Sequence, residues 1–337
     1  MNQQNVMGCL DCIADAYRYN PVEKYLRSGE WDGVDRHEEL CNILGVTDIR
    51  HQTYITKWLC QCVALGLNQE KNPIGADGVL VLQGPQGIGK TSVVRKITPY
   101  PRWFTEGASI DMSVKDTVIT ALSGWITELG ELDTTLKKEQ ASLKAFVTRP
   151  EDRIRRPYAR KDARTPRQTS FCGTVNPKDY LKDETGSRRV WTVPVRKIDK
   201  VALHSLTREW VDQLWYQTLA LWQLDRNYFR LRDDELEELQ NANREFEVAL
   251  PYEMEIKALL DYDLPVSQWE WWKASEVAAL MPGVAGARKV GKALSRISSA
   301  LVSVFSALEG SDQMGKTFRK KDGFTEYLLP LRHFRSN

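Results

Sequence analysis

The sequence predicts an α/β fold in which a parallel sheet carries helices on its faces. Short continuous apolar runs recur along the middle of the chain, as in strands buried on both faces of a parallel sheet. Stretches with helical spacing alternate with these runs, as in α/β domains. Because 42% of the 337 residues are hydrophobic, the chain can bury such a sheet. The expected strands cover residues 77–84, 124–129, 168–175 and 188–195.

Helical spacing dominates the chain before the first strand and after the last one. Residues 2–68 contain LCNILGV and YITKWLCQCVALGL, whose apolar residues recur every three or four positions. Between the strands, TSVVRKI and LKKEQASLKAFVT show the same spacing. After Pro194 the helical pattern resumes at residues 203–224 and continues through an acidic stretch at residues 231–250, which we interpret as a solvated helix.

The last segment of the chain has its own order of elements. ASEVAALM and ARKVGKALSRISSAL predict two helices, and KTFRKKDGFTEYLLPL predicts two strands across an Asp322-Gly323 turn. Helix, helix and hairpin is the order of a winged-helix module, and a small α+β cap without a nucleic-acid role is the alternative. We therefore predict four regions: a helical region at 1–70, an α/β domain at 71–200, a helical region at 201–262 and a winged-helix-like domain at 263–337.

Composition argues against two classes of protein. The longest uncharged apolar stretch, residues 297–308, has 12 residues and contains serines, whereas a membrane span needs about 20. The first twenty residues lack the basic start and apolar run of a secretory signal. Six thinly spread cysteines predict reduced thiols, and Cys9 and Cys12 are interpreted as one side of a helix rather than as a zinc site. We expect a cytoplasmic protein with no membrane partner.

The strongest motif follows the first predicted strand. Residues 84–91, GPQGIGKT, fit G-x-x-x-x-G-K-[ST] and open the helix TSVVRKI, which is where a phosphate-binding loop must lie. Its glycines let backbone N–H groups turn toward a phosphate, Lys90 reaches the β and γ oxygens, and the Thr91 hydroxyl holds Mg²⁺. The predicted cofactors are ATP and Mg²⁺, and the predicted nucleotide-binding residues are Gly84, Gly87, Ile88, Gly89, Lys90, Thr91 and Ser92.

A nucleotide hydrolase also needs a carboxylate at the end of a neighbouring strand, where it binds the metal's water shell and orients the attacking water. The candidate is WITELGE, in which Glu128 closes the strand and Glu131 follows it. Either residue could activate the water, and their spacing does not decide between them. Thr91 and Glu128 are the predicted metal ligands. The alternative is that both are surface acids on a helix.

Two further positions near predicted strand ends could also act on a bound nucleotide. Asn176 ends the next apolar run, where its amide could sense a γ-phosphate or the water. Arg188 and Arg189 follow the turn signal TGS at the edge of the domain, where an arginine could stabilise phosphate charge in a neighbouring subunit. The ordinary alternatives are a turn residue for Asn176 and a surface salt bridge for the arginines.

These blocks together resemble a known family. WITELGELDTTL, LKAFVTRPEDRIRRPYAR, FCGTVNPKDYLKDETGSRRVW and the glycine-rich motif, in this order, resemble the virulence-associated E (VirE/VapE) family of phage and prophage proteins. That family is related to superfamily 3 helicases of the AAA+ class, and the resemblance covers roughly residues 20–195. It implies a ring, usually a hexamer, that hydrolyses ATP between subunits while moving along DNA in a bacterial host.

The resemblance also assigns roles to the predicted site residues. It makes residues 84–91 the Walker A loop, places Glu128 and Glu131 in the Walker B block, puts Asn176 at the sensor position and gives the arginine-finger place to Arg188 or Arg189. Relatives often carry a primase domain ahead of the motor, and the sequence before the first strand is too short for one.

A basic segment lies between the Walker B block and the sensor position, where superfamily 3 motors have a hairpin in the central channel. Residues 149–167 hold eight basic and three acidic residues. Cations can follow phosphates while an aromatic ring stacks on a base, a combination used for single strands. Some of these arginines could line the ATP interface instead. The predicted DNA-contacting residues are Arg153, Arg155, Arg156, Tyr158, Arg160 and Lys161, and a second, weaker surface comprises Arg288, Lys289, Lys292, Arg296, Lys320 and Lys321.

The function expected from the sequence is an ATP-dependent DNA helicase or translocase of phage or prophage replication. A second hypothesis is an ATP-dependent switch or loader that binds DNA or a replication protein without unwinding. A third is a protein that occupies a host or rival-phage protein, with hydrolysis incidental. The pore-like basic segment distinguishes the first hypothesis from the others, because only unwinding requires it.

Overall fold

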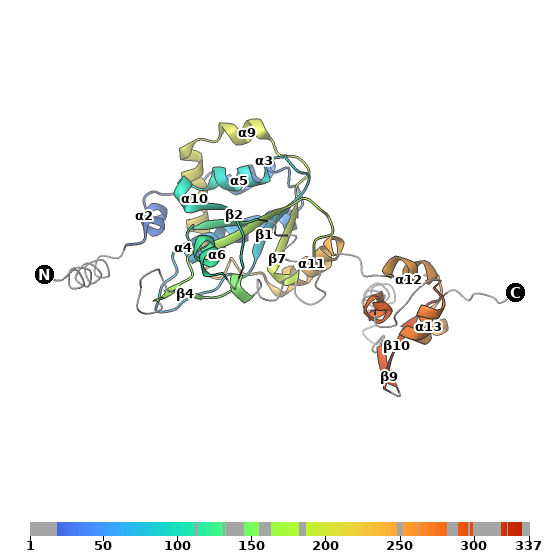
Figure 1. The fold of residues 1–337 in the computed structure, drawn as a ribbon. Coiled ribbons are helices and arrows are strands. Elements are labelled where there is room, and N and C mark those ends of the chain that lie inside the picture. The colour runs from blue at the N-terminus through green and yellow to red at the C-terminus, as the bar shows by residue number, and fades with distance from the viewer. Residues whose placement is uncertain are drawn as a thin grey trace. The chain divides into compact units, whose positions relative to one another are not determined.

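The computed structural model shows an α/β fold and divides the chain into two compact units, residues 1–247 and 248–337 (Figure 1). Each unit is described by itself. The predicted boundaries at residues 70, 200 and 262 stay predictions. The structure describes residues 19–111, 114–130, 132, 145–154, 163–181, 187–247, 252–261, 263–281, 289–295, 297–298, 318–321 and 323–331.

A five-stranded parallel sheet forms the centre of the first unit, in the order β2-β3-β6-β1-β7. Four of its strands confirm the predicted ones, and their apolar residues are buried on both faces as a parallel sheet requires. The fifth, β2, was not predicted because its sequence FTEGA has no apolar run and is largely exposed. The strands are β1 (Val79–Gln83), β2 (Phe104–Ala108), β3 (Ile126–Leu129), β6 (Ser170–Val175) and β7 (Val190–Pro194).

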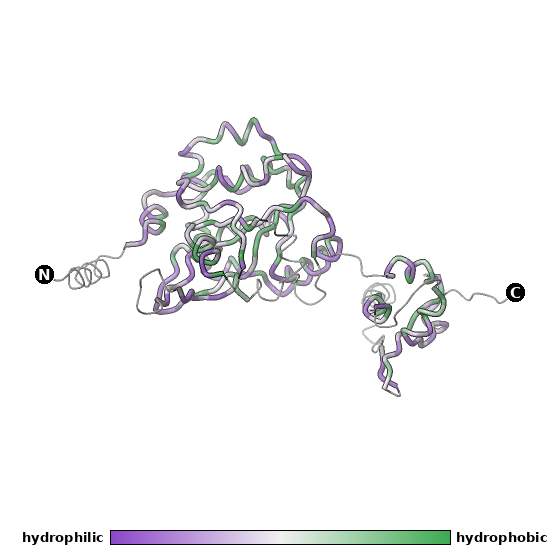
Figure 2. Tube along the Cα trace, in the orientation of Figure 1, coloured by the Kyte–Doolittle hydropathy of each residue, from purple (hydrophilic) through white to green (hydrophobic). Residues whose placement is uncertain are grey.

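Helices cover both faces of this sheet (Figure 1). One hydrophobic cluster joins α4, α5 and α10 to β1 and β7, and a second cluster on the other face joins α6 to β1, β3 and β6. The core follows the apolar strands, which Figure 2 shows in green. The helices of this unit are α2 (Pro21–Leu26), α3 (Arg36–Ile43), α4 (Ile49–Gly66), α5 (Lys90–Ile97), α6 (Lys115–Ala121), α9 (Lys200–Ser205), α10 (Arg208–Leu224) and α11 (Asp233–Asn243).

Buried tryptophans fix the helices against the strands. The Trp58 indole on α4 donates to the Phe171 carbonyl on β6 at 2.8 Å, and the Trp215 indole on α10 donates to the Ile97 carbonyl at the end of α5 at 2.7 Å. Each ring therefore buries its apolar body while its N–H finds a partner. The predicted helices before and after the sheet thus share one core with it.

Side-chain caps set where several helices begin. Asn20, Asp35, Asp48 and Asp199 each accept a hydrogen bond from backbone N–H groups in the first turn, and the Thr207 hydroxyl does so for α10. Thr207 also explains why the predicted helix at residues 203–224 is divided into α9 and α10, because its extended backbone interrupts the helix.

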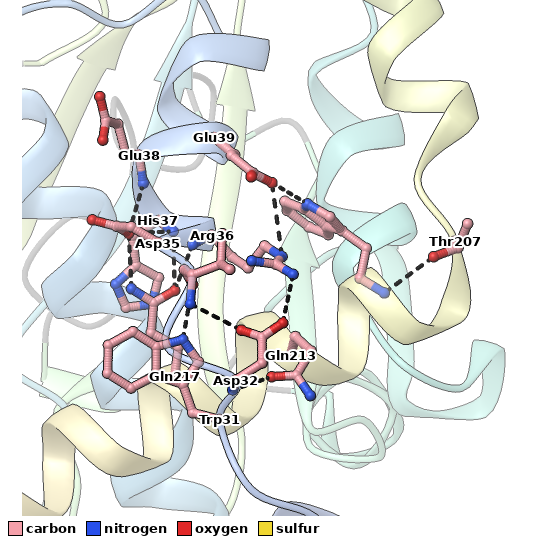
Figure 3. A network of polar contacts seen from close by, with 12 residues as sticks. Trp31, Asp32, Asp35, Arg36, His37, Glu38, Glu39, Thr207, Gln213 and Gln217 are labelled. Atoms are coloured by element: carbon pink, nitrogen blue, oxygen red, sulfur yellow. Dashed lines mark hydrogen bonds and ion pairs between the residues drawn. The ribbon is translucent and has the colours of Figure 1, made fainter.

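A polar network then ties α3 to α10 (Figure 3). The Gln217 side-chain oxygen accepts from the Arg36 backbone N–H at 2.7 Å, and its amide donates to Asp35 at 2.8 Å. The Arg36 guanidinium lies between Asp32, at 2.9 Å, and Glu39, at 3.8 Å. The segment ahead of the sheet is therefore held to a helix that lies 181 residues later in the chain.

A two-stranded antiparallel hairpin lies between β3 and β6 in the chain. Its strands are β4 (Glu151–Ile154) and β5 (Ala163–Pro166), and residues 155–162 between them lie outside the described residues. Antiparallel strands here agree with the hairpin that the family resemblance implies for this segment. Most of the helix expected at 136–148 also lies outside the described residues.

The second unit has a small core of its own. Its elements are α12 (Glu253–Leu259), β8 (Glu270–Lys273), α13 (Ala274–Ala279), β9 (Phe318–Lys321) and β10 (Phe324–Leu329), and the three strands form an antiparallel sheet in the order β8-β10-β9. The predicted helix at 274 and the predicted hairpin are both present, with Gly323 at φ 77° in the turn. The assignment as a winged helix stays a prediction.

Within the described residues, none of the helices combines the length and apolar character needed to cross a membrane. The four cysteines in the same residues carry free, buried thiols, and burial raises the pKa of Cys41 and of Cys60 to about 12. The reduced state stays a prediction, and Cys9 and Cys12 lie outside the described residues.

Candidate functional site

The glycine-rich loop, residues 84–89, connects the carboxyl end of β1 to the first residue of α5. Gly87 and Gly89 have φ of 77° and 108°, a conformation that residues with a Cβ rarely adopt. At Gly84 a Cβ would lie 1.9 Å from the carbonyl oxygen of Val195, the residue after β7, so the backbone there leaves no room for a side chain. The loop therefore presents backbone at the start of a helix, which is a geometry that binds anions.

Lys90 is the first residue of α5, and its side chain folds back under the loop. Its ammonium donates to the Gly84 and Pro85 carbonyls at 2.7 and 2.8 Å and to the Asn176 side-chain oxygen at 3.0 Å. Burial lowers the pKa of this ammonium, and the nearby Glu128 carboxyl opposes that shift. Lys90 and Asn176, both predicted from the sequence, are thus brought together.

Glu128 lies on β3, two strands away from β1, and is 4% exposed. One carboxylate oxygen, Oε1, accepts from the Thr91 hydroxyl at 2.7 Å and from the Thr174 hydroxyl at 2.9 Å. Burial raises the pKa of the Glu128 carboxyl, while these two hydrogen bonds oppose the shift. A buried carboxylate with a raised pKa at a strand end is the kind of group that catalytic sites use.

The three strands explain this convergence. β3, β6 and β1 are parallel neighbours, so their carboxyl ends meet at one edge of the sheet. Glu128 lies near the end of β3, Asn176 follows the end of β6, and the glycine-rich loop follows the end of β1. The sequence predicted each strand end separately, and the strand order, with β6 between β3 and β1, places them within hydrogen-bond reach.

The donor set fits a magnesium nucleotide. The Thr91 hydroxyl and a Glu128 carboxylate oxygen lie side by side next to an ammonium, and Mg²⁺ prefers one or two such oxygens with phosphates and water completing its shell. The described residues contain no cluster of three acidic, His or Cys side chains that could hold a metal ion. Ser92 lies in the first turn of α5, where backbone N–H groups have no partner within the helix, and Ile88 lies in the loop just ahead of it, so each can offer its backbone N–H to a phosphate.

Arg188 and Arg189 lie at the opposite edge of the sheet from the glycine-rich loop. They immediately precede β7, which runs parallel to β1, so a five-residue strand of about 16 Å separates the two edges. Within one copy of the chain these arginines and the loop are not brought together.

The predicted DNA-contacting residues fall mostly on residues that the structure does not describe. Arg155, Arg156, Tyr158, Arg160 and Lys161 lie there, and so does the second candidate acid, Glu131, together with Arg288 and Arg296 of the weaker surface. Arg153 is described: it is exposed on β4 and lies directly opposite Arg164 on β5.

Two polar residues at the site were missed from the sequence. Thr174 lies on β6 and shares the Glu128 oxygen; its position two residues before Asn176 was the only signal that could have drawn attention to it. Lys200 opens α9 and donates to the Gly87 carbonyl at 3.1 Å, which places a second ammonium beside the glycine-rich loop. Nothing in the sequence indicated that contact, because 113 residues separate the two partners.

Comparison with known proteins bears on the family. No curated protein matches the chain. Two solved structures of the NrS-1 C-terminal region are similar at 14% and 15% sequence identity, each with a TM-score of 0.49, and they cover 94% and 93% of this chain and 79% of theirs. Residues 26–248, more than half of the chain, match the virulence-associated protein E-like domain. This chain therefore belongs to the virulence-associated protein E-like family.

Proposed function

We propose that the protein is an ATP-dependent DNA helicase or translocase of phage or prophage replication, built on a P-loop core related to superfamily 3 helicases of the AAA+ class. The observation that carries the proposal is the meeting of Lys90, Asn176, Thr91 and Glu128 at the carboxyl edge of the sheet. Family membership adds to it. These residues supply what phosphoryl transfer needs, namely positioning and charge stabilisation.

Each residue has a defined task in this proposal. The N–H groups of the glycine-rich loop hold the phosphates, and Lys90 exchanges its carbonyl partners for the β and γ oxygens. Thr91 and Glu128 would hold Mg²⁺, which would supply positive charge against the phosphates. Glu128 or Glu131 orients the attacking water, and Asn176 contacts the γ-phosphate or that water. Arg188 or Arg189 acts on the nucleotide of the next subunit in a ring, which we expect to be a hexamer.

The β4–β5 hairpin supports a nucleic-acid partner. Arg153 and Arg164 face each other across the two strands, and like charges directly opposite each other destabilise a hairpin. No carboxylate in the described part of the chain forms an ion pair with either of them. A polyanion between the two guanidiniums removes the repulsion, and a single DNA strand provides one phosphate per nucleotide.

ATP hydrolysis with and without single-stranded DNA tests the proposal. The parent protein should hydrolyse ATP in the presence of Mg²⁺, and Lys90→Ala should abolish both binding of a fluorescent ATP analogue and turnover. If Lys90→Ala binds and hydrolyses ATP as well as the parent, the proposal is wrong.

A second measurement separates unwinding from a switch or loader. Arg156→Ala with Tyr158→Ala should abolish unwinding of a forked duplex and stimulation of turnover by DNA while ATP binding is kept. Lys71→Ala removes an exposed cation outside the β4–β5 hairpin and should change neither unwinding nor the stimulation of turnover by DNA. Unchanged activity of the double variant would favour the switch, and turnover that ignores DNA at every salt concentration would favour a protein that only occupies a partner.

A further inference from the structure

An arginine-lined groove opens at the amino edge of the central sheet, on the side away from the glycine-rich loop. Its volume is about 570 Å³. It is lined by residues 73–77 ahead of β1, by Thr148 and Pro150, by Leu231 ahead of α11 and by Leu236 on α11. Its described lining includes the guanidiniums of Arg188, Arg189 and Arg230. We call it the arginine groove.

The charge of the arginine groove is unbalanced. Of the described residues that line it, Asp77 alone is acidic, and its carboxylate lies 3.9 Å from the Arg230 guanidinium, at the long limit of an ion pair. Among the described residues, Arg188 and Arg189 form no ion pair at all. The three guanidiniums and one carboxylate among the described lining residues sum to a net positive charge, which attracts a compact polyanion.

Arg230 is positioned from within the core. Lys57, which is 2% exposed on α4, donates to the Arg230 carbonyl at 2.7 Å and to the Tyr228 carbonyl at 3.0 Å, and it pairs with Glu235 at 3.0 Å. These contacts fix the backbone that carries Arg230 while 46% of its side chain stays exposed. A guanidinium on a fixed backbone loses little freedom when it binds a ligand.

The chemistry of three guanidiniums selects phosphate. Guanidinium presents parallel N–H donors that match the oxygens of a phosphate, so several of them around one groove suit a triphosphate better than an isolated carboxylate. The groove cannot serve the glycine-rich loop of its own copy, because β1 separates the two. A head-to-tail contact between copies, in contrast, places different edges of the sheet against each other.

We propose that the arginine groove receives the triphosphate of a nucleotide bound to the glycine-rich loop of a second copy, and that Arg230 contacts that triphosphate together with Arg188 or Arg189. This inference rests on the proposed function and adds Arg230, which no sequence motif indicates. Arg230 belongs to the polypeptide between α10 and α11, so the helical region after the sheet contributes directly to the composite site.

Complementation between inactive variants tests this proposal. Arg230→Ala keeps its glycine-rich loop and should bind a fluorescent ATP analogue as the parent does, while turnover falls by about tenfold or more. Lys90→Ala keeps its arginine groove. Co-expressed copies of the two variants should regain turnover, because the intact groove of one variant then faces the intact loop of the other. Arg230→Lys should recover only part of the rate, since lysine restores the charge but lacks the parallel N–H donors of a guanidinium.

Arg226→Ala is the matched control, because Arg226 lies on the same connection but packs over the Trp222 ring at 3.7 Å and does not line the groove. Its turnover should equal that of the parent. Full turnover by Arg230→Ala overturns the inference while leaving the proposed function intact. A loss of turnover that co-expression with Lys90→Ala does not restore also overturns the inference and leaves the proposed function intact. Full turnover with weaker binding of single-stranded DNA would assign the groove to DNA instead. If the parent protein does not hydrolyse ATP, both this inference and the proposed function are wrong.

Discussion

Arg167 and Asp152 form a bidentate ion pair across the base of the β4–β5 hairpin, with donor–acceptor distances of 2.5 and 2.6 Å. Arg167 is fully buried, and its guanidinium lies over the rings of Phe146 and Phe171. Phe171 belongs to β6, the strand that also carries Thr174. The pair therefore fastens the base of a basic hairpin to a strand of the candidate nucleotide site.

Removing one partner of this pair should cost a large part of the stability of the fold. Asp152→Ala leaves the Arg167 guanidinium buried without its carboxylate, and such a loss costs about 3 to 5 kcal/mol. Arg164→Ala, an exposed change on the adjoining strand, should alter stability by no more than about 0.5 kcal/mol. Urea unfolding followed by tryptophan fluorescence measures both. Equal stability of the two variants would show that the pair does not hold the hairpin.

Replacing the buried carboxylate of the candidate site should stabilise the ligand-free protein. Because burial raises the pKa of Glu128, the folded state holds the proton more tightly than the unfolded chain, and stability is lost as the pH rises above the ordinary value of 4.5. Glu128→Gln keeps an acceptor for Thr91 without the charge. Its melting temperature should exceed that of the parent near neutral pH, and the difference should shrink in acid. Turnover should be lost although the nucleotide still binds.

His37 should make the stability of the first unit depend on pH. Burial lowers its pKa from 6.5 to about 4, although Asp35 opposes the shift. Its Nε2 lies 2.8 Å from the Thr218 hydroxyl, which itself donates to the Leu214 carbonyl, so Nε2 carries the hydrogen of the neutral ring. Below pH 6.5 the unfolded chain binds more protons, and stability falls as the pH drops toward 4, by up to about 3 kcal/mol.

The measurement for His37 is the free energy of unfolding across that pH range. His37→Gln should flatten the slope, since glutamine can donate to Thr218 and does not titrate. The exposed His204 provides the comparison, and His204→Gln should leave the slope as it is in the parent. A parent protein whose stability is constant over this range would contradict the assignment of a neutral buried ring.

Lys200 should contribute to nucleotide affinity. Its ammonium is exposed and lies 3.1 Å from the Gly87 carbonyl, so a bound phosphate would offer it a stronger partner than a carbonyl. Lys200→Ala should weaken binding of an ATP analogue by about twofold to fivefold, as expected for loss of one partly screened charge contact. Lys197→Ala, also exposed, should bind normally. Calorimetric titration of both variants and the parent measures the difference, and equal affinities would remove Lys200 from the site.

The sequence predicted the parts of the fold that local chemistry determines. The glycine-rich loop could be found because its glycines, Lys90 and Thr91 are neighbours in the chain. Glu128 and Asn176 could be found because each ends an apolar run, and the carboxyl ends of parallel strands lie at one edge of a sheet. Strand β2 was missed because an exposed edge strand has no need of a continuous apolar sequence.

The missed site residues depend on contacts between distant segments. Arg230 lines the same groove as Arg189, and Lys57, on a helix that precedes the sheet, donates a hydrogen bond to the Arg230 carbonyl. Lys200 reaches the glycine-rich loop from a helix that follows the last strand of the sheet. Local spacing carries no information on such contacts, so a description of the site from sequence stops at the residues that adjoin the predicted strands.

The length of β1 has a consequence for when ATP is consumed. The glycine-rich loop and the arginine groove lie at its two ends, so in our proposal a single copy of the chain binds ATP without hydrolysing it. Newly made protein would then stay idle at low concentration and begin to work only after copies meet. Assembly of the copies, rather than synthesis of the protein, would determine when hydrolysis of the host's ATP begins.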